Sequence, residues 1–363
     1  MKTIKKTVSA LLSLTTIIGS LSIVPVSASA KEGVPYTERT WQDSAIVEST
    51  EICSDFNTLG ESAKQLETGW YVVDSDLTLS DRLTVANDQD VHMILCDGCK
   101  LNAPKGVIVS DTARLTVYGQ SGSTGVLEAY NPDGAGIGGL DEKKAGTMLF
   151  KGGTINATGG GKDAGIGTGK NDDSKFRMIE IYGGTVNAKG GHMGAGIGGG
   201  TEYRTSIITE PTGIKGTLTD IMDFFNFDIG DGGEGGPVEI NGGIVIAWGG
   251  KESSAIGYGQ EGDELGELKI SDDLSVYDIG IASDYHLSYG DIINTLTKLQ
   301  DHSRKEIMQE IKEKLSSDLS IESLKEKIKI QEIAKGERSK TCQAEEKLVV
   351  IMPKNINNPG ELN

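Results

Sequence analysis

Short runs of alternating apolar and polar residues fill the middle of the chain, and pairs of glycines separate them. Examples are IEI at residues 179–181 and VEI at residues 238–240, each followed closely by Gly-Gly. Alternation with a period of two predicts short, half-buried strands, and the glycine pairs predict tight turns between them. The pattern predicts an all-β structure in this part of the chain and excludes helices.

The glycine-rich segments are repeats that keep one phase. One block reads GAGIGG at residues 134–139, DAGIG at 163–167, GAGIGG at 194–199 and SAIG at 254–257. A second block reads GGTINATGG at 152–160, GGTVNAKGG at 183–191 and GGIVIAWGG at 242–250. The isoleucines of the first block are 29, 31 and 59 positions apart, so the last interval spans about two repeats and contains an insertion.

A repeat of about 30 residues with three short strands cannot bury its own apolar side, whereas stacked copies form a continuous interior. The sequence therefore predicts a right-handed parallel β-helix, a solenoid in which each repeat is one rung. Because burying each large apolar side chain contributes ~1.5–3 kcal/mol, the inward ladders should carry the stability. These ladders are Phe150, Ile181 and Ile240; Leu127, Ile155, Val186 and Val245; and Ala129, Ala157, Ala188 and Ala247.

The outward positions of the same strands form columns, which are the candidate binding surface. Rungs ~4.8 Å apart offer a regular grid to an extended polymer, with aromatic rings for stacking on sugars and amides or carboxylates for their hydroxyls. A single outward aromatic is more often a turn residue, so the prediction depends on the columns. The expected ligand contacts are Tyr118, Tyr130, Tyr182, Trp248, Asn156, Asn187, Glu180 and Glu239.

The N-terminal segment of the chain differs from the repeats. Residues 1–30 combine three lysines, an apolar-biased stretch and an Ala-Ser-Ala site, which is the pattern of a signal peptide. A membrane anchor is the alternative, but Ser and Thr interrupt the stretch, and no later segment is long and apolar enough to span a bilayer.

The expected organisation is a signal peptide at 1–30, an N-terminal segment or cap at 31–67, the β-helix at 68–282, a helical insertion at 283–338, and a final strand and tail at 339–363.

Two segments interrupt the solenoid pattern. The insertion at 201–235 contains Phe224, Phe225 and Phe227, which either pack on the solenoid flank or form a lid or docking element. Residues 288–335 show three-to-four spacing that predicts two helices, the second including Ile328 and ending at Gly336. We expect these helices to cover strand edges of the solenoid, with partner binding as the alternative. Residues 348–351 then predict a final strand.

Charge and cysteine content narrow the choice of partners. The formal net charge is −18, so nucleic acid and anionic lipid are poor partners. Acidic loops suit Ca²⁺, although most are only solvated, and no cofactor is required. The cysteines predict a structural disulfide or free thiols, because the Cys-Asp-Gly-Cys segment has no second pair to complete a zinc site. The candidate calcium ligands are Asp172, Asp173, Asp228 and Asp231, and the cysteines are Cys53, Cys96, Cys99 and Cys342.

The repeats resemble a group of exported Gram-positive surface proteins in the pectate-lyase-like β-helix superfamily, built from GAGIGG repeats alternating with GGTVxAxGG segments. The segments GWYVV at 69–73, MILCDG at 93–98 and LTVYG at 115–119 look like the N-terminal rungs of that group. The resemblance covers roughly residues 68–282. It implies a secreted or cell-surface module of a type sometimes grouped with carbohydrate-binding solenoids.

Catalysis has to be judged from residues, because the same fold carries lyases, hydrolases and non-enzymes. His192 falls in the same turn as Lys162 and Lys251 of neighbouring repeats, no Arg-x-Lys follows it, and no nucleophile elbow or HExxH segment occurs. We therefore predict a non-catalytic solenoid that binds polysaccharide. The alternatives are an adhesive stalk with a protein partner, and a Ca²⁺-dependent acidic-polysaccharide lyase or a glycoside hydrolase. The oligomeric state stays open.

Overall fold

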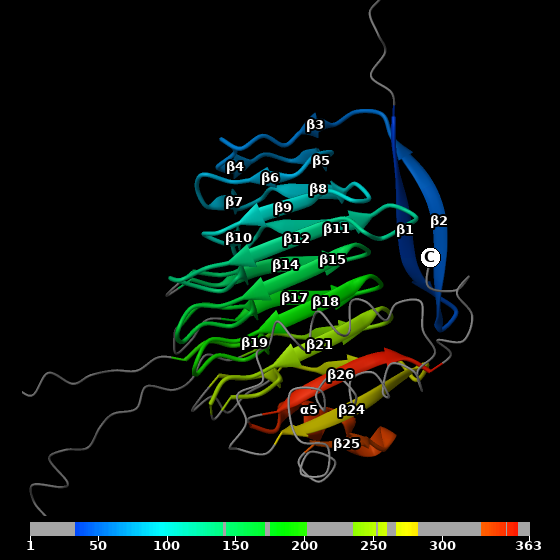
Figure 1. Cartoon of the computed structure of the whole chain (residues 1–363), viewed down its shortest axis with the longest axis vertical. Coiled ribbons are helices and arrows are strands. Elements are labelled where there is room, and N and C mark those ends of the chain that lie inside the picture. The colour runs from blue at the N-terminus through cyan, green and yellow to red at the C-terminus, as the bar shows by residue number, and fades with distance from the viewer. Residues whose placement is uncertain are drawn as a thin grey trace, which may run out of the picture. The chain divides into compact units, whose positions relative to one another are not determined.

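The computed structural model describes residues 33–140, 143–170, 175–201, 235–251, 253–259, 266–281, 328–345 and 347–354. Three sheets form the body of the described chain (Figure 1). From β4 to β23, neighbouring strands of a sheet are three elements apart in the chain, because each turn of the chain adds one strand to every sheet. This arrangement confirms the predicted parallel β-helix.

The strands are as follows. Sheet I contains β3 (Asn57–Thr58), β5 (Gly69–Val73), β8 (Asp90–Leu95), β11 (Arg114–Gly119), β14 (Ala145–Phe150), β17 (Phe176–Ile181), β20 (Val238–Ile240) and β23 (Leu268–Ile270). Sheet II contains β4 (Gln65–Leu66), β7 (Leu83–Val85), β10 (Val107–Val109), β13 (Ile137–Gly138), β16 (Ile166–Gly167), β19 (Ile197–Gly198) and β22 (Ile256–Gly257). Sheet III contains β6 (Leu77–Thr78), β9 (Lys100–Ala103), β12 (Val126–Tyr130), β15 (Thr154–Thr158), β18 (Thr185–Lys189), β21 (Ile244–Trp248), β26 (Leu348–Pro353), β24 (Leu274–Ile281) and β25 (Ile328–Glu332).

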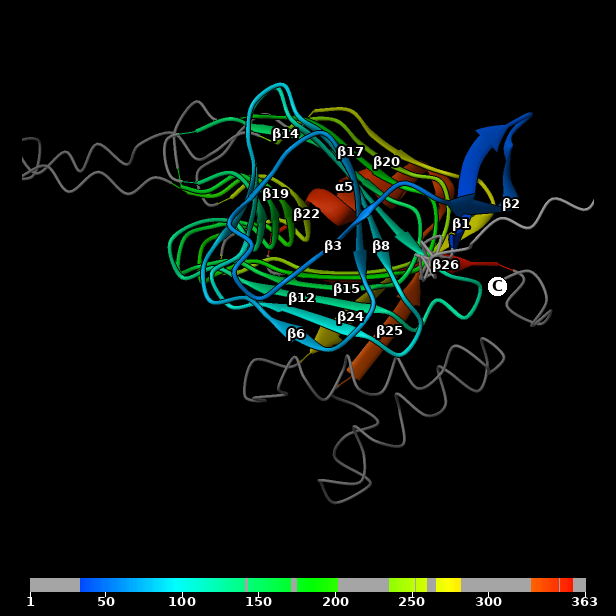
Figure 2. The ribbon, with the colours of Figure 1, turned by 90° about the horizontal axis from the view of Figure 1, so that it is seen from above.

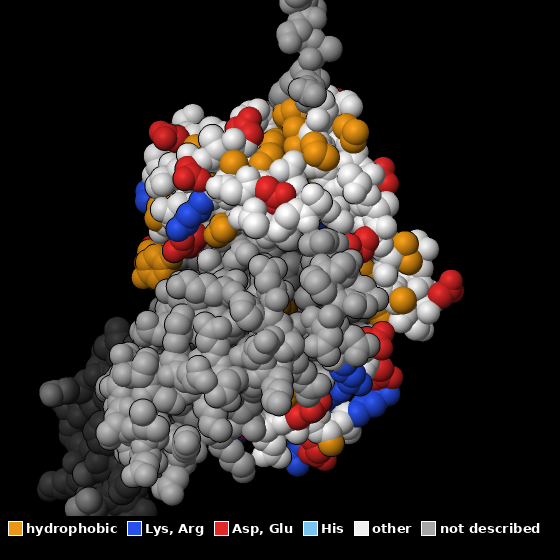
Figure 3. All heavy atoms as spheres, turned by 45° about the vertical axis from the view of Figure 1, so that its right-hand side comes forward, with side chains coloured by type: hydrophobic (Ala, Val, Ile, Leu, Met, Phe, Trp, Pro, Cys, Tyr) orange, Lys and Arg blue, Asp and Glu red, His pale blue; other side chains and the backbone are white. Residues whose placement is uncertain are grey.

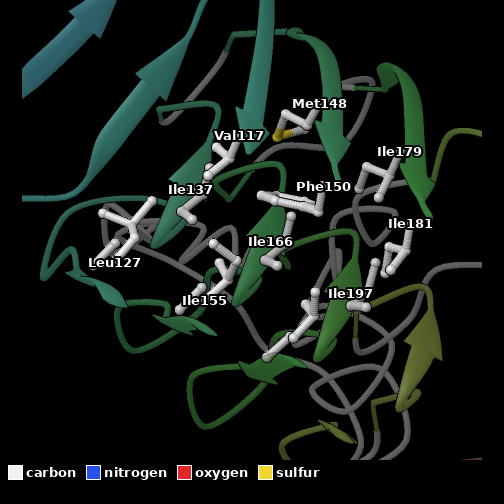
Figure 4. Close-up of a cluster of buried hydrophobic side chains, with 14 of the residues drawn as sticks. Val117, Leu127, Ile137, Met148, Phe150, Ile155, Ile166, Ile179, Ile181 and Ile197 are labelled. Atoms are coloured by element: carbon white, nitrogen blue, oxygen red, sulfur yellow. The ribbon is translucent and has the colours of Figure 1, made fainter. Parts of the chain in front are cut away.

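The three inward ladders are confirmed. Phe150 pairs with Ile181, and Ile181 pairs with Ile240, in sheet I. The leucine, isoleucine and valine ladder and the alanine ladder run in register through β12, β15, β18 and β21. All these side chains are buried, and Figure 4 shows several of them converging between the sheets. The sheets enclose this interior when the stack is seen from above (Figure 2).

The solenoid sheets begin before residue 68 and continue past the insertion at 201–235. Strands β3 and β4 already belong to sheets I and II. After the insertion, β20 pairs in parallel with β17, so the rungs resume in register. The three phenylalanines of the insertion lie outside the described residues, and so does their predicted role.

An N-terminal hairpin precedes the solenoid. Strands β1 (Val34–Gln42) and β2 (Ala45–Cys53) are antiparallel and joined by Asp43 and Ser44. Both joining residues have positive φ, 49° and 67°, which is the backbone of a type I′ turn. The hairpin lies along the side of the stack (Figures 1 and 2).

Aromatic and charged contacts from β1 anchor this hairpin to sheet I. The ring of Tyr36 lies 4.8 Å from that of Trp70 and 4.9 Å from that of Tyr118. The buried guanidinium of Arg39 donates from Nε to Glu48 Oε1 at 2.6 Å and from Nη1 to the carbonyl oxygen of Lys151. Because a buried charge needs such partners, Arg39 ties the hairpin to the turn after β14.

The C-terminal segment closes the other end of the stack. The final strand predicted at 348–351 is present as β26, but it runs antiparallel between β21 and β24. The sequence predicted a helix through Ile328 as far as residue 335. This prediction is wrong for residues 328–332, because Ile328–Glu332 forms β25 against β24. The alternation IKI at 328–330 has the period of a strand, and pairing with β24 prevails over the helical spacing. The rest of the predicted helical pair lies outside the described residues.

A short helix packs against the last strands of sheets I and II, β23 and β22. The 3-10 turn η1 (Lys335–Glu337) leads into α5 (Arg338–Gln343), so Gly336 lies within η1 and does not end a helix. Cys342 is buried in the core, and Ser254 Oγ donates to the carbonyl oxygen of Gln343 at 2.6 Å. No helix of the described chain is long and apolar enough to cross a membrane.

Candidate ligand-binding groove

The last residues of four neighbouring strands of sheet III form one outward-facing column. Tyr130, Thr158, Lys189 and Trp248 are the last residues of β12, β15, β18 and β21 and stack in register. Each follows an inward alanine, so the alternation of the strand turns it outward. The small alanine side chains point into the interior, and the longer side chains that follow them in each strand lie on the surface.

Glycine turns form the second wall beside this column. Residues 159–161, 190–191 and 249–250 are glycines, and with His192 and Lys251 they complete an open groove of about 600 Å³. Backbone approaches backbone here, since a Cβ on Gly191 would lie 1.5 Å from the carbonyl oxygen of Gly160. The stacked turns therefore expose a narrow backbone surface between the side chains.

The groove combines aromatic, hydroxyl and basic groups. Trp248 and Lys189 lie together, with Nζ of the lysine 5.4 Å from the centroid of the indole ring. This is within the range of a cation–π interaction, which holds the ammonium group over the aromatic face. The side chain of Tyr130 is 49% exposed at the other end of the column. No carboxylate is among the groove-lining side chains of the described residues.

The asparagine column lies on the same sheet but is less accessible. Asn187 Nδ2 donates to Asn156 Oδ1 at 2.7 Å, and the asparagine pair links two rungs. Asn187 is buried and Asn156 is half-buried. In this conformation the two amides bind each other, and Asn187 offers no surface to a ligand.

The remaining predicted contacts lie in strands of sheet I or directly after one of them, and they are engaged within the protein. Tyr118 is buried beneath Tyr36 of the hairpin, and this burial raises its pKa far above the ordinary value. Tyr182 donates from its hydroxyl to Glu180 Oε1 at 3.2 Å, and burial together with that carboxylate raises the pKa of Tyr182 to about 12. Glu239 pairs with Lys269 Nζ at 2.9 Å.

The structure thus divides the predicted site residues between two surfaces. Tyr130 and Trp248 share the groove, whereas Tyr118, Tyr182 and the two glutamates belong to sheet I. The expected ligand contacts did not include Lys189, His192 or Lys251. The sequence contained a signal for each, because Lys189 lies in the same outward column as Tyr130 and Trp248, and His192 and Lys251 occupy one position in successive turns.

The calcium and cysteine predictions have different outcomes. Asp172, Asp173, Asp228 and Asp231 lie outside the described residues, and within the described ranges no cluster of three His, Cys, Asp or Glu side chains could hold a metal ion. All four cysteines are free thiols. Burial raises the pKa of Cys96 to about 11 and that of Cys342 to about 12, so both thiols are protonated at neutral pH.

A histidine beneath the hairpin gives a testable pH dependence. The ring of His92 stacks on Trp70 at 4.5 Å, Nδ1 lies 3.2 Å from the Tyr118 hydroxyl, and burial lowers its pKa despite Asp90 nearby. At pH values between the pKa of His92 in the folded protein and its pKa of about 6.5 in the unfolded chain, the unfolded chain binds more protons than the folded protein. The contribution of His92 to stability is therefore fully present above pH 6.5 and is lost as the pH falls toward the folded pKa.

Replacing His92 with phenylalanine, which keeps a ring but cannot titrate, should remove this dependence. Denaturant unfolding of both proteins at pH 7.5 and pH 5 measures it. The free energy of unfolding of the wild type should fall more than that of His92→Phe on acidification. An equal fall in the two proteins would contradict the prediction.

Comparison with known proteins agrees with the architecture. No curated protein and no solved structure matches the chain. Residues 151–170 and 179–201 match the family model described as "Beta helix repeat", and these residues include Thr158 and Lys189 of the groove. Together with the stacked parallel sheets, this match supports the parallel β-helix architecture of a solenoid protein.

Proposed function

We propose that this protein is an exported, non-catalytic β-solenoid that binds polysaccharide. The binding site is the groove that follows the C-terminal ends of successive strands of sheet III. The observation that carries the proposal is the column from Tyr130 to Trp248, in which aromatic and basic side chains border an open groove. Aromatic faces pack on the apolar faces of sugar rings, and ammonium, imidazole and hydroxyl groups bind sugar oxygens.

The dimensions of the groove suit an extended polymer. Tyr130 and Trp248 are three rungs apart, which corresponds to about 14 Å at ~4.8 Å per rung. Thr158 and Lys189 occupy the two rungs between them. A polymer lying along the solenoid axis would therefore meet a ring at each end of the column and hydrogen-bonding groups between the rings.

Export and surface location are part of the proposal and are supported by the sequence. The first thirty residues have the pattern of a signal peptide. The repeats also resemble those of exported Gram-positive surface proteins of the pectate-lyase-like superfamily. A chain of this charge remains well solvated outside the cell, where extended glycans are available as ligands.

Titration of the mature chain against a panel of soluble and insoluble polysaccharides tests the proposal. Calorimetry and pull-down measure affinity, both with Ca²⁺ and with a chelator, while absorbance reports unsaturated products. Trp248→Ala and Tyr130→Ala should each weaken binding about tenfold or more, as expected for aromatic anchors. Trp41→Ala is the matched control, because Trp41 is 37% exposed on the hairpin, away from the groove.

The other outcomes discriminate between functions. Absence of binding to every glycan, or equal binding by Trp248→Ala and wild type, would overturn the groove as a glycan site and favour the adhesive stalk. Release of unsaturated sugars that depends on Ca²⁺ would show a lyase.

A further inference from the structure

Strand β2 has an unpaired edge. In the part of the chain that the structure describes, β2 pairs with β1 alone. The two-residue loop makes Gln42 and Ala45 a hydrogen-bonded pair, and such pairs alternate along an antiparallel ladder. The N–H and C=O groups of every second residue from Ala45 onward therefore face β1, and those of the residues between them face away. These outward-facing residues are Ile46, Glu48, Thr50 and Ile52.

Strand β2 lacks most of the usual protections of an edge strand; among the described residues its one carboxylate outside an ion pair is Glu51, which accepts a hydrogen bond from Ser49 Oγ at 2.8 Å. Natural edges carry proline, bulges or unpaired charges that prevent further pairing. Strand β2 is nine residues long, contains no proline, and pairs with β1 without a bulge. The carboxylate of Glu48 is neutralised by Arg39. No backbone hydrogen bond from another described segment reaches the outward groups of β2.

The hairpin also carries most of the exposed large apolar side chains. Among the described residues these are Trp41 at 37% exposure, Val47 at 44%, Ile52 at 66% and Tyr130 at 49%. Three of these four belong to β1 and β2, and hydrophobic and acidic side chains are mixed on this side of the molecule (Figure 3). An edge with apolar side chains on it is suited to pairing with another strand.

We propose that β2 pairs antiparallel with β2 of a second copy of this chain, about a two-fold axis at Ser49. This register brings all four outward-facing residues into hydrogen-bonded pairs, with Ile46 opposite Ile52 and Glu48 opposite Thr50. The two hairpins then form one four-stranded sheet across the molecules. A two-fold contact of this kind is closed, because each copy uses the same edge.

Avoidance of like charges directly opposite each other selects the register, and this self-pairing register selects a second copy as the occupant. With the axis at Ser49, no carboxylate faces another carboxylate, since Glu51 lies opposite Val47 and Glu48 opposite a threonine hydroxyl. Moving the axis to Glu48 would place that carboxylate opposite its own copy, and like charges directly opposite are destabilising. Moving it to Thr50 would leave Ile46 unpaired. The strand is therefore complementary to itself in one register.

The association should be weak and should depend on salt. An edge-to-edge contact of one strand buries less than the ~1,200 Å² of a stable interface. The full chain has a formal charge of −18, so two copies repel each other, and added salt screens this repulsion. We expect a dimer whose fraction rises with protein concentration and with NaCl, as measured by sedimentation equilibrium of the mature chain.

Two pairs of variants test the geometry. Thr50→Pro removes an outward N–H without removing a hydrogen bond to β1, so it should shift the protein to monomer, whereas Thr50→Ala should not. Ser49→Cys faces itself across the axis at a non-hydrogen-bonded position, where Cβ atoms lie ~4.5–5.5 Å apart. It should form a covalent dimer on incubation with oxidised glutathione, whereas Glu51→Cys, which faces Val47, should not. A wild type that stays monomeric at all concentrations, or equal cross-linking of the two cysteine variants, would overturn the proposal.

Discussion

Replacing Gly198 with alanine is expected to lower the free energy of unfolding by about 2–6 kcal/mol, the sum of backbone strain and overpacking of ~1–3 kcal/mol each. Gly198 has φ = 145°, a region that side chains avoid, and it stacks between Gly167 and Gly257 in sheet II. A Cβ there would lie 1.8 Å from the carbonyl oxygen of Gly257. The backbones of neighbouring rungs would have to move apart to admit it.

Gly60→Ala is the matched control for this substitution. Gly60 is exposed, nothing lies within 4 Å of a Cβ built on it, and its φ is not positive. Its substitution should change stability by no more than about 0.5 kcal/mol. Chemical denaturation followed by circular dichroism measures both variants. Equal midpoints for Gly198→Ala and wild type would show that the stacked glycines of sheet II tolerate a side chain, against the packing described above.

Replacing Phe150 with alanine should cost about 3–5 kcal/mol, the range for removing a buried aromatic ring. Phe150 is fully buried, and its neighbours in the ladder are Val117 on one rung and Ile181 on the other. Each rung of a solenoid contacts only its neighbours, so the cavity cannot be filled from elsewhere in the core. Phe150→Leu leaves a smaller cavity and should lose less.

Thermal and denaturant unfolding of the two variants distinguish a cavity from a specific loss of the aromatic ring. A graded loss, with Phe150→Ala well below Phe150→Leu, is the expected result. If both variants lose the same stability, the ring contributes through its aromatic contacts and not through the volume that it fills.

The interior of the solenoid was predictable because its pattern is local and repeated. Leu127, Ile155 and Val186 follow one another at one repeat position, and stacking requires equivalent residues to pair. The C-terminal segment has no repeat to follow, and there the prediction was less accurate. Ile328 fits both a helical face and a period-two strand, and only β24 beside it decides for the strand.

The candidate site was predictable only as columns. The alternation that turns Trp248 outward also turns Tyr118 outward, and the sequence contains nothing that separates the two. In the folded protein Tyr36 covers Tyr118, whereas Trp248 borders an open groove. The difference depends on where the hairpin docks.

The solenoid, its rungs and its inward ladders can be predicted from local sequence, because strand alternation and glycine turns act over a few residues and then repeat. The accessible outward columns, the pairing of the C-terminal strands and the edge of β2 that has no partner among the described residues follow from long-range packing. These features depend on contacts such as Arg39 with the turn after β14, which join segments far apart in the chain. Such contacts have no periodicity, so local pattern could not reveal them.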